Sequence, residues 1–184
     1  LGGTMGDGAV LWAEGISSIY TEDRSEGEMD GRFGVIHLGG DFEVNERLVV
    51  GAMASFDWAE EDLDEVSNLS GTGWMVGPYL SAEILDNLFL SWRFSWGESD
   101  NDAELELFAP GERWSGGFRT RRLLSYLTLA GRVDSGAFTV IPEISAGYIR
   151  ETQRDYEVSS GARDVSIEGQ ELELGLGEVA AELQ

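Results

Sequence analysis

The stretch Gly77–Gly97, GPYLSAEILDNLFLSWRFSWG, determines how the rest of the chain is interpreted. Successive side chains of a β-strand point to opposite faces of the sheet. In the second half of this stretch, large apolar residues alternate with mostly small or charged ones, which would place on one face Leu88, Leu90, Trp92, Phe94 and Trp96. The first half alternates more weakly, and Leu85-Asp86-Asn87 marks a tight turn between the halves. The stretch predicts a hairpin of two long strands, without saying which face is wet.

Six further segments alternate in a similar way, and the chain shows no helical periodicity of comparable quality. They predict strands at 9–20, 33–44, 48–58, 120–133, 137–149 and 165–179. The facing of the first stays open, because Trp12 and Tyr20 share a face with Glu14. Pro78 and Pro142 fall inside two of the predicted strands, and a bulge is expected at each because proline cannot donate a ladder hydrogen bond.

Composition limits the classes of function. The chain has 184 residues, enough for one domain spanning 1–184, and a net charge of −23 from 35 acids against 12 bases. This charge excludes nucleic acid as an expected partner, since phosphate binding relies on clustered Lys and Arg. There are no cysteines, hence no disulfide or thiolate metal site. No apolar run is long enough for a transmembrane helix, but a membrane strand needs only about 9–11 alternating residues.

The connections between predicted strands alternate between long and short. Short turns lie near 45–47, 85–87 and 134–136, whereas long polar loops are expected at 21–32, 59–71, 98–119 and 150–164. An up-and-down barrel whose two ends face different environments produces this asymmetry. The predicted fold is therefore all-β, an up-and-down antiparallel transmembrane β-barrel of which about eight strands are present.

Aromatic residues support a membrane barrel, because indole and phenol rings prefer the headgroup level at the two water interfaces. The residues predicted to face lipid or to form the aromatic girdle are Trp58, Trp74, Trp92, Phe94, Trp96, Tyr148, Phe42 and Phe138. The opposite strand faces carry the residues predicted to line the lumen, namely His37, Asp41, Glu43, Glu83, Arg93, Arg132 and Glu143.

The order and spacing of several segments resemble the C-terminal translocator, or β-domain, of bacterial autotransporters. The matching pieces are 39–42 with 48–52, 77–80, 117–120, and 141–144 with 148–151, and the resemblance covers about residues 12–178. It implies a twelve-stranded outer-membrane barrel, threaded by a helix that joins it to a secreted passenger. About eight strands are counted here, so the chain is expected to be part of a longer barrel, without passenger, linker helix or last strands.

No residue is predicted to be catalytic. His37 shares its face with Asp41 and Glu43, a setting for a general base or a metal ligand, but no motif such as Gly-x-Ser-x-Gly presents a nucleophile, so a polar lumen residue is the preferred interpretation. The acidic runs at 60–65 and 100–104 could bind Ca²⁺ through oxygen ligands, but they lack an EF-hand pattern and are interpreted as solvated loops. No metal and no cofactor are expected.

The hypothesis from sequence is a non-enzymatic outer-membrane translocator that anchors and exports a passenger through its lumen. Its expected partners are outer-membrane lipid, its own passenger segment and the barrel assembly machinery. Two alternatives remain: a small stand-alone outer-membrane barrel with an adhesive or structural role, and a soluble lipocalin-like barrel with its apolar face inward.

Overall fold

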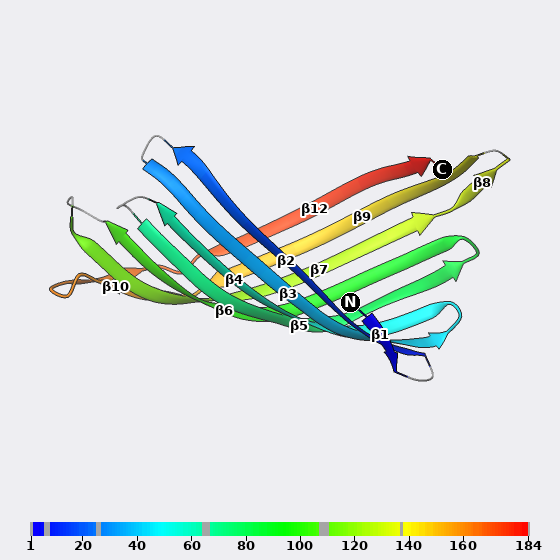
Figure 1. Cartoon of the computed structure of the whole chain (residues 1–184), viewed down its shortest axis with the longest axis horizontal. Coiled ribbons are helices and arrows are strands. Elements are labelled where there is room, and N and C mark those ends of the chain that lie inside the picture. Colours follow the sequence, from blue (N-terminus) through cyan, green and yellow to red (C-terminus); the bar gives the residue numbers. More distant parts are fainter. Residues whose placement is uncertain are drawn as a thin grey trace.

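A computed structural model describes residues 2–5, 8–24, 27–63, 67–106, 111–136 and 138–183. They form one sheet of twelve antiparallel strands (Figure 1). The long strands are β2 (Ala9–Arg24), β3 (Gly27–Asn45), β4 (Leu48–Leu63), β5 (Ser67–Leu85), β6 (Leu88–Glu106), β7 (Arg113–Gly131), β9 (Phe138–Gln153) and β12 (Glu171–Leu183). The short ones are β1 (Gly2–Met5), β8 (Val133–Ser135), β10 (Tyr156–Ser159) and β11 (Asp164–Ile167). The predicted hairpin is confirmed as β5 and β6.

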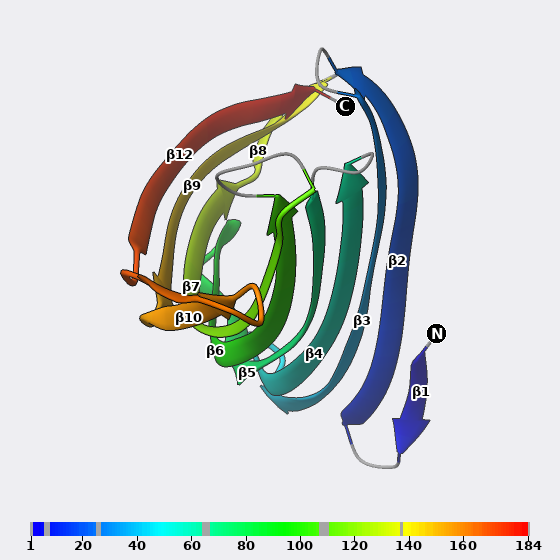
Figure 2. The same ribbon diagram turned by 90° about the vertical axis from the view of Figure 1, so that its left-hand side faces the viewer.

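Each long strand pairs with the next long strand along the chain, which confirms the up-and-down order. The sheet curves strongly, so that β2 and β12 stand at its two sides and their concave faces look toward each other (Figure 2). In the described part of the chain these two edges do not pair with each other. The fold is a curved, open sheet, and no described helix is long and apolar enough to cross a membrane.

Three of the four long polar loops predicted from sequence are wrong over most of their length, because the strands continue through them, and the fourth, 150–164, contains the end of β9 and the separate short strand β10. β2 runs to Arg24, β4 to Leu63 and β6 to Glu106, and only the tips at 25–26, 64–66 and 107–110 lie outside the described residues. Cross-strand ion pairs hold the polar extensions together, such as Arg119 Nε with Asp100 Oδ1 at 2.6 Å. Opposite charges facing each other across strands contribute roughly 0.2–1 kcal/mol per pair.

The end of the chain also differs from the prediction. Instead of one strand at 165–179, the structure has β11 and then β12, which begins at Glu171. The β10 and β11 pair forms a small hairpin joined to β7 through Ser159 and Ser115.

The bulges predicted at Pro78 and Pro142 are not found. The ladder is interrupted beside each proline and resumes in the same register. The register shifts lie instead beside the short turns, between Glu43 and Asn45 and between Glu83 and Leu85. Asn87, in the second of these turns, has a φ of 64°, a left-handed conformation that asparagine tolerates better than most residues.

The strand register assigns each side chain of the strands to the concave or the convex face of the sheet. Trp12 of β2 and Tyr79 of β5 meet above the two intervening strands, which is possible only on the concave side. The facing of β2, left open by the sequence, follows directly: Trp12, Glu14 and Tyr20 are concave and Leu11 and Ile19 are convex. Among the described residues, the largest fully buried side chains are Trp114 and Val158, at the polar end of the strands, where β10 meets β7.

Candidate functional site on the concave face

Aromatic side chains form a floor on the concave face of β2 to β5. The indole Nε1 of Trp12 donates a hydrogen bond to the Tyr79 hydroxyl at 2.8 Å, although 67 residues separate the two in the chain. The Trp12 ring lies over Gly39 and the Tyr79 ring over Gly51, where any Cβ would overlap them. Glycine at these two positions therefore leaves room for the two rings to meet, with centroids 6.2 Å apart and planes tilted by 58°.

Above this floor is a cavity of about 700 Å³. Asp41 and Glu14 line it, and Asp41 lies beside the Tyr79 hydroxyl. One carboxylate oxygen of Asp41, Oδ1, is shielded from solvent and has no hydrogen-bond donor. The guanidinium of Arg93, also in the lining, lies 5.4 Å from the centroid of the Tyr126 ring, a cation–π contact. The cavity combines aromatic faces with a carboxylate whose charge is incompletely balanced.

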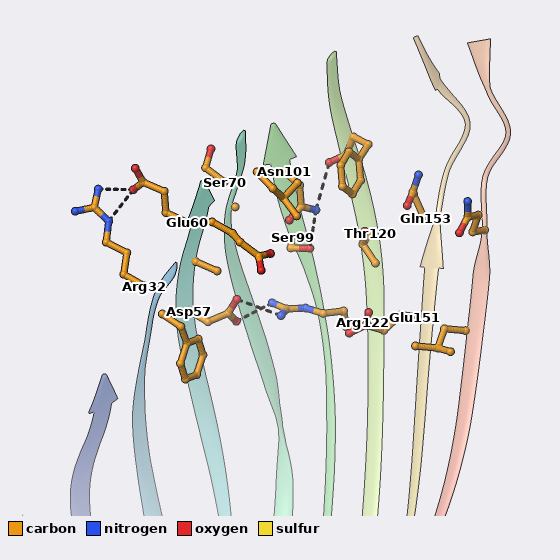
Figure 3. Close-up of a pocket in the computed structure, with 18 of the residues that line it drawn as sticks. Arg32, Asp57, Glu60, Ser70, Ser99, Asn101, Thr120, Arg122, Glu151 and Gln153 are labelled. Atoms are coloured by element: carbon orange, nitrogen blue, oxygen red, sulfur yellow. Dashed lines mark hydrogen bonds and ion pairs between the residues drawn. The ribbon is translucent and has the colours of Figure 1, made fainter. Parts of the chain in front are cut away.

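A second cavity, of about 570 Å³, lies nearer the polar ends of the strands (Figure 3). Arg122 of β7 reaches across β6 and β5 to Asp57 of β4, with nitrogen to oxygen distances of 2.7 and 3.1 Å. The crossing requires Gly73, because a Cβ there would overlap the guanidinium. The two side chains are only 18% and 22% exposed, so this bidentate pair is shielded far more than the ion pairs of the strand extensions.

The β10 and β11 hairpin bends inward over the polar end of the concave face (Figure 2). Val158 is fully buried and approaches Gly116 of β7. The Phe118 and Tyr156 rings are 5.0 Å apart, and the Arg163 guanidinium lies 5.6 Å from the centroid of Trp114. This hairpin narrows the space above the concave face at the polar end of the strands.

Leucines form an apolar stripe on the opposite wall. β12 pairs with β9 so that Leu174 faces Ile149 and Gly175 faces Tyr148, which puts Leu172, Leu174 and Leu176 on the concave face. Leu124 of β7 pairs with Ile149 and extends the stripe. We call Leu124, Ile149, Leu172, Leu174 and Leu176 the leucine stripe. The concave face is therefore acidic and aromatic along β2 to β5, whereas along β7, β9 and β12 it carries the leucine stripe beside polar residues such as Arg122 and Glu143.

His37 has a serine within reach that sequence reasoning did not find. Its Nδ1 lies 2.7 Å from Ser55 Oγ, on the neighbouring strand β4. Both residues sit in the regular ladder, whose backbone N–H groups are already engaged with adjacent strands, so the contact provides no cluster of free donors for an oxyanion. The pair is best described as a polar contact of the concave wall. Among the residues that the structure describes, no three acidic or histidine side chains are grouped to hold a metal ion.

All the residues predicted to line the lumen map to the concave side by register: His37, Asp41, Glu43, Glu83, Arg93, Arg132 and Glu143. Several have partners there: Glu83 is 3.7 Å from Arg47, and Glu143 accepts a hydrogen bond from Ser145 at 3.2 Å. Near the third short turn, Arg132 contacts Asp134, and Thr139 donates a 2.6 Å hydrogen bond that lowers the pKa of the Asp134 carboxyl.

All the residues predicted for the girdle or for lipid contact map to the convex side: Trp58, Trp74, Trp92, Phe94, Trp96, Tyr148, Phe42 and Phe138. Trp74 and Trp96 pack edge to face with centroids 5.2 Å apart. Trp92 Nε1 donates to Ser125 Oγ at 3.1 Å, so a serine on the convex face satisfies an indole. Contact with lipid itself stays a prediction at this point.

Sequence reasoning missed the residues that span the concave face, namely Trp12, Tyr79, Asp57 and Arg122. The signal that could have found them is glycine at strand positions facing the same side, Gly39, Gly51 and Gly73, because each leaves room for a long side chain from another strand. That signal becomes readable only with the register known.

An antiparallel, strongly curved sheet of long strands, with most of its charged pairs and cavities on the concave face and large apolar side chains exposed on the convex face, is typical of outer-membrane-type barrel domains. The family model described as "Autotransporter beta-domain" matches residues 11–184, and the chain belongs to this family. Domains of this family are transport domains, generally non-catalytic and typically located in the outer membrane.

Solved structures agree in fold. The chain is similar to the translocator domain of the autotransporter NalP from Neisseria meningitidis, with a TM-score of 0.77, 15% identity, and coverage of 97% of this chain and 63% of that one. It is also similar to the β-domain of the Bordetella autotransporter BrkA, with a TM-score of 0.69, 16% identity, and coverage of 96% and 70%. The ferric citrate transporter FecA matches at a TM-score of 0.64 and 9% identity over 31% of its chain. The search of curated proteins gave no match.

Proposed function

We propose that this chain is the membrane part of an autotransporter: it anchors the protein in the outer membrane and lets a passenger polypeptide pass along its concave side. The observation that carries the proposal is the division of the sheet into two faces within a family of translocators. Large apolar side chains stay exposed over the convex face, among them Phe42 at 50%, Phe56 at 51% and Ile144 at 55%. Such a surface is costly in water and suits lipid.

The concave face supports the export part of the proposal. It carries carboxylates, small residues and the spanning pair of Arg122 and Asp57, which suits hydrated polypeptide better than lipid. A lipocalin-like barrel would reverse the two faces, placing its apolar side inward. The chain spans 63% of the NalP translocator domain, so the proposal concerns a sheet that reaches closure and export in a longer protein. Assembly by the barrel assembly machinery belongs to the same proposal.

Paired substitutions test membrane placement. Leu90 and Ser91 are neighbours on β6, with Leu90 convex and Ser91 concave. We expect Leu90→Arg to block membrane assembly, because an arginine facing lipid near the midplane costs about 2–4 kcal/mol, and Ser91→Arg to be tolerated. The measurement is heat-modifiable gel migration of outer-membrane fractions. Equal effects of both variants would contradict the assigned facing.

Export is tested with the full-length protein carrying an epitope in its passenger, expressed in a Gram-negative host. We expect the epitope to be accessible to antibody and protease on intact cells. The Leu90→Arg protein should leave it inaccessible, whereas Ser91→Arg should not. A correctly assembled barrel that never exposes the epitope would refute the export function while leaving the anchoring function intact.

A further inference from the structure

We infer that the second cavity, which contains the Arg122 and Asp57 pair, is a binding site for a short, neutral carbohydrate. The inference goes beyond anchoring and export and requires neither of them, because the site is formed by the folded sheet itself. The proposed membrane placement adds only the source of the sugar. It turns the polar ends of the strands toward the cell exterior, where lipopolysaccharide and free glycans are found.

The first step is an aromatic wall. Tyr20 of β2 and Phe33 of β3 line the cavity. The Tyr20 ring lies over Gly31, where a Cβ would overlap it, and the Tyr20 hydroxyl lies 3.4 Å from Glu61 Oε1 on β4. Tyr20 is 42% exposed and Phe33 40%, so both rings keep accessible apolar surface. The C–H groups of a sugar ring are apolar and pack against surfaces of this kind, because an aromatic ring offers a large, flat area for burial.

The second step is a polar wall with unused hydrogen-bonding groups. Glu151 and Gln153 lie two residues apart on β9, so both face the cavity from the concave side (Figure 3). Within the described part of the chain, neither side chain makes a hydrogen bond or an ion pair. A carboxylate accepts through two oxygens, and a carboxamide has one acceptor and two donor hydrogens. Sugar hydroxyls both donate and accept, so neighbouring hydroxyls complement these two planar groups.

The third step is charge. Five carboxylates line the cavity, and three of them are paired with arginines, with the Asp57 pair the most shielded. Glu61 accepts from the Tyr20 hydroxyl, which leaves Glu151 as a carboxylate without a described partner. The paired arginines are already neutralised and offer little to an anion. One free carboxylate is also far from the set of about six to eight oxygens that a calcium ion takes. The arrangement therefore favours an uncharged ligand.

The fourth step is the shape of the site. Ser99 and Thr120, each 8% exposed, lie buried in the lining, and Asn101 Nδ2 donates to Ser99 Oγ at 3.1 Å. These contacts fix polar groups from β6 and β7 between the aromatic and the polar wall. The volume of about 570 Å³ lies within the roughly 300–1,000 Å³ of small-ligand pockets. A site of this size suits a short oligosaccharide.

The test uses the full-length protein in a polyoxyethylene detergent, which carries no sugar, with folding checked by heat-modifiable migration. The protein is applied to an array of neutral and acidic oligosaccharides that includes the dephosphorylated core oligosaccharide of the host's lipopolysaccharide. Calorimetry then gives the dissociation constant of each ligand found. We expect a neutral glycan to bind, with an affinity that changes by less than about twofold between low and high salt, because screening acts on charges.

The array also distinguishes the two sources of sugar. Binding of the core oligosaccharide alone would assign the site to lipopolysaccharide, whereas binding of other neutral glycans would assign it to free carbohydrate. Absence of binding to every glycan, or binding of acidic glycans alone, would overturn the inference.

Matched variants locate the binding and separate the cavity from the passenger. Phe33→Leu keeps an apolar side chain but removes the flat ring, and should weaken binding at least about fivefold. Phe42→Leu makes the same change on the convex face of β3 and should have no effect. Gln153→Leu should also weaken binding, which keeps the test decisive if Phe33→Leu does not fold. Equal losses in Phe33→Leu and Phe42→Leu would place the sugar elsewhere and refute the site.

Glu151→Gln tests whether the ligand is neutral. The amide keeps two hydrogen-bonding atoms and removes the charge, so affinity for a neutral sugar should stay within about threefold. A cationic ligand would lose most of its affinity, and that result would contradict the inference. Passenger exposure on the same cells separates this inference from the proposed function. Export without glycan binding removes the carbohydrate site alone, and glycan binding without export removes the export function alone.

Discussion

Trp114 offers the sharpest test of how the β10 and β11 hairpin packs against the polar end of the concave face. Its side chain is 1% exposed, and the Arg163 guanidinium lies over its ring. In the strand ladder, Trp114 pairs with Leu105 of β6. Replacing it with alanine removes the indole from a site that the β10 and β11 hairpin covers. Trp→Ala substitutions in cores typically cost about 3–5 kcal/mol. Since each 1.4 kcal/mol is tenfold, the hairpin should open roughly a hundred- to several-thousand-fold more often.

Hydrogen exchange with mass spectrometry, on the chain in detergent micelles, measures this opening directly. We expect amides of residues 156–167 to exchange much faster in Trp114→Ala, while those of the central parts of β5 and β6 keep their protection. Trp58→Ala is the control, because it deletes the same side chain from the convex face, where Trp58 is 42% exposed. Unchanged exchange at 156–167 in Trp114→Ala, or the same acceleration in Trp58→Ala, would refute the packing described here.

Two further predictions concern the polar contacts. Arg122→Met should lower the free energy of unfolding by about 2 kcal/mol, the scale of a shielded hydrogen bond between charged groups, and Gly73→Ala should cost a similar amount because its Cβ displaces the guanidinium from Asp57. Urea unfolding in micelles should then show that the double variant is no less stable than Arg122→Met alone. Additive losses of the two substitutions would contradict the crossing of Arg122 over Gly73. Asp134 has a lowered pKa because Thr139 donates a hydrogen bond to its carboxylate, so the contribution of Asp134 to stability is present above the ordinary carboxyl pKa and is lost as the pH falls through the lowered value. Thr139→Val should move the pKa of Asp134, measured by NMR titration, upward. An unchanged titration would exclude this hydrogen bond as the cause.

Alternation of side chains predicted the strands well where one face is uniformly apolar. The hairpin of β5 and β6 follows from Leu90, Trp92, Phe94 and Trp96, and the structure places these residues on one face as the period of two requires. The same rule failed beyond the tryptophans. Here β6 is polar on both faces, with Glu98, Asp100 and Asp102 on the convex side and Ser99 and Asn101 on the concave side, so the contrast that marks a strand is missing. Only the cross-strand partners of Glu98 and Asp100, Arg121 and Arg119, reveal the continuing ladder.

The concave site could be predicted only as a list of polar residues. Trp12 and Tyr79 are neighbours because the sheet curves and because two intervening glycines leave room, and neither condition can be seen in a linear pattern. The same holds for Arg122 and Asp57, which are separated by two strands. Long-range side-chain contacts across a trough depend on register and curvature together, so their prediction needs both.

β12 shows why an apolar alternation does not by itself identify the outer face. Leu172, Leu174 and Leu176 alternate with acids and glycines as cleanly as the leucines of β6, yet the pairing of Gly175 with Tyr148 turns them to the concave side. The reason is chemical as well as geometric: Glu171 and Glu173 form ion pairs with Arg150 on the convex side, beside Tyr148, and so prefer the polar end of the outer surface. Further along β12 the convex positions become apolar, with Val179 82% exposed. The outer surface is therefore polar at one level and apolar at another, and the concave surface acquires the leucine stripe.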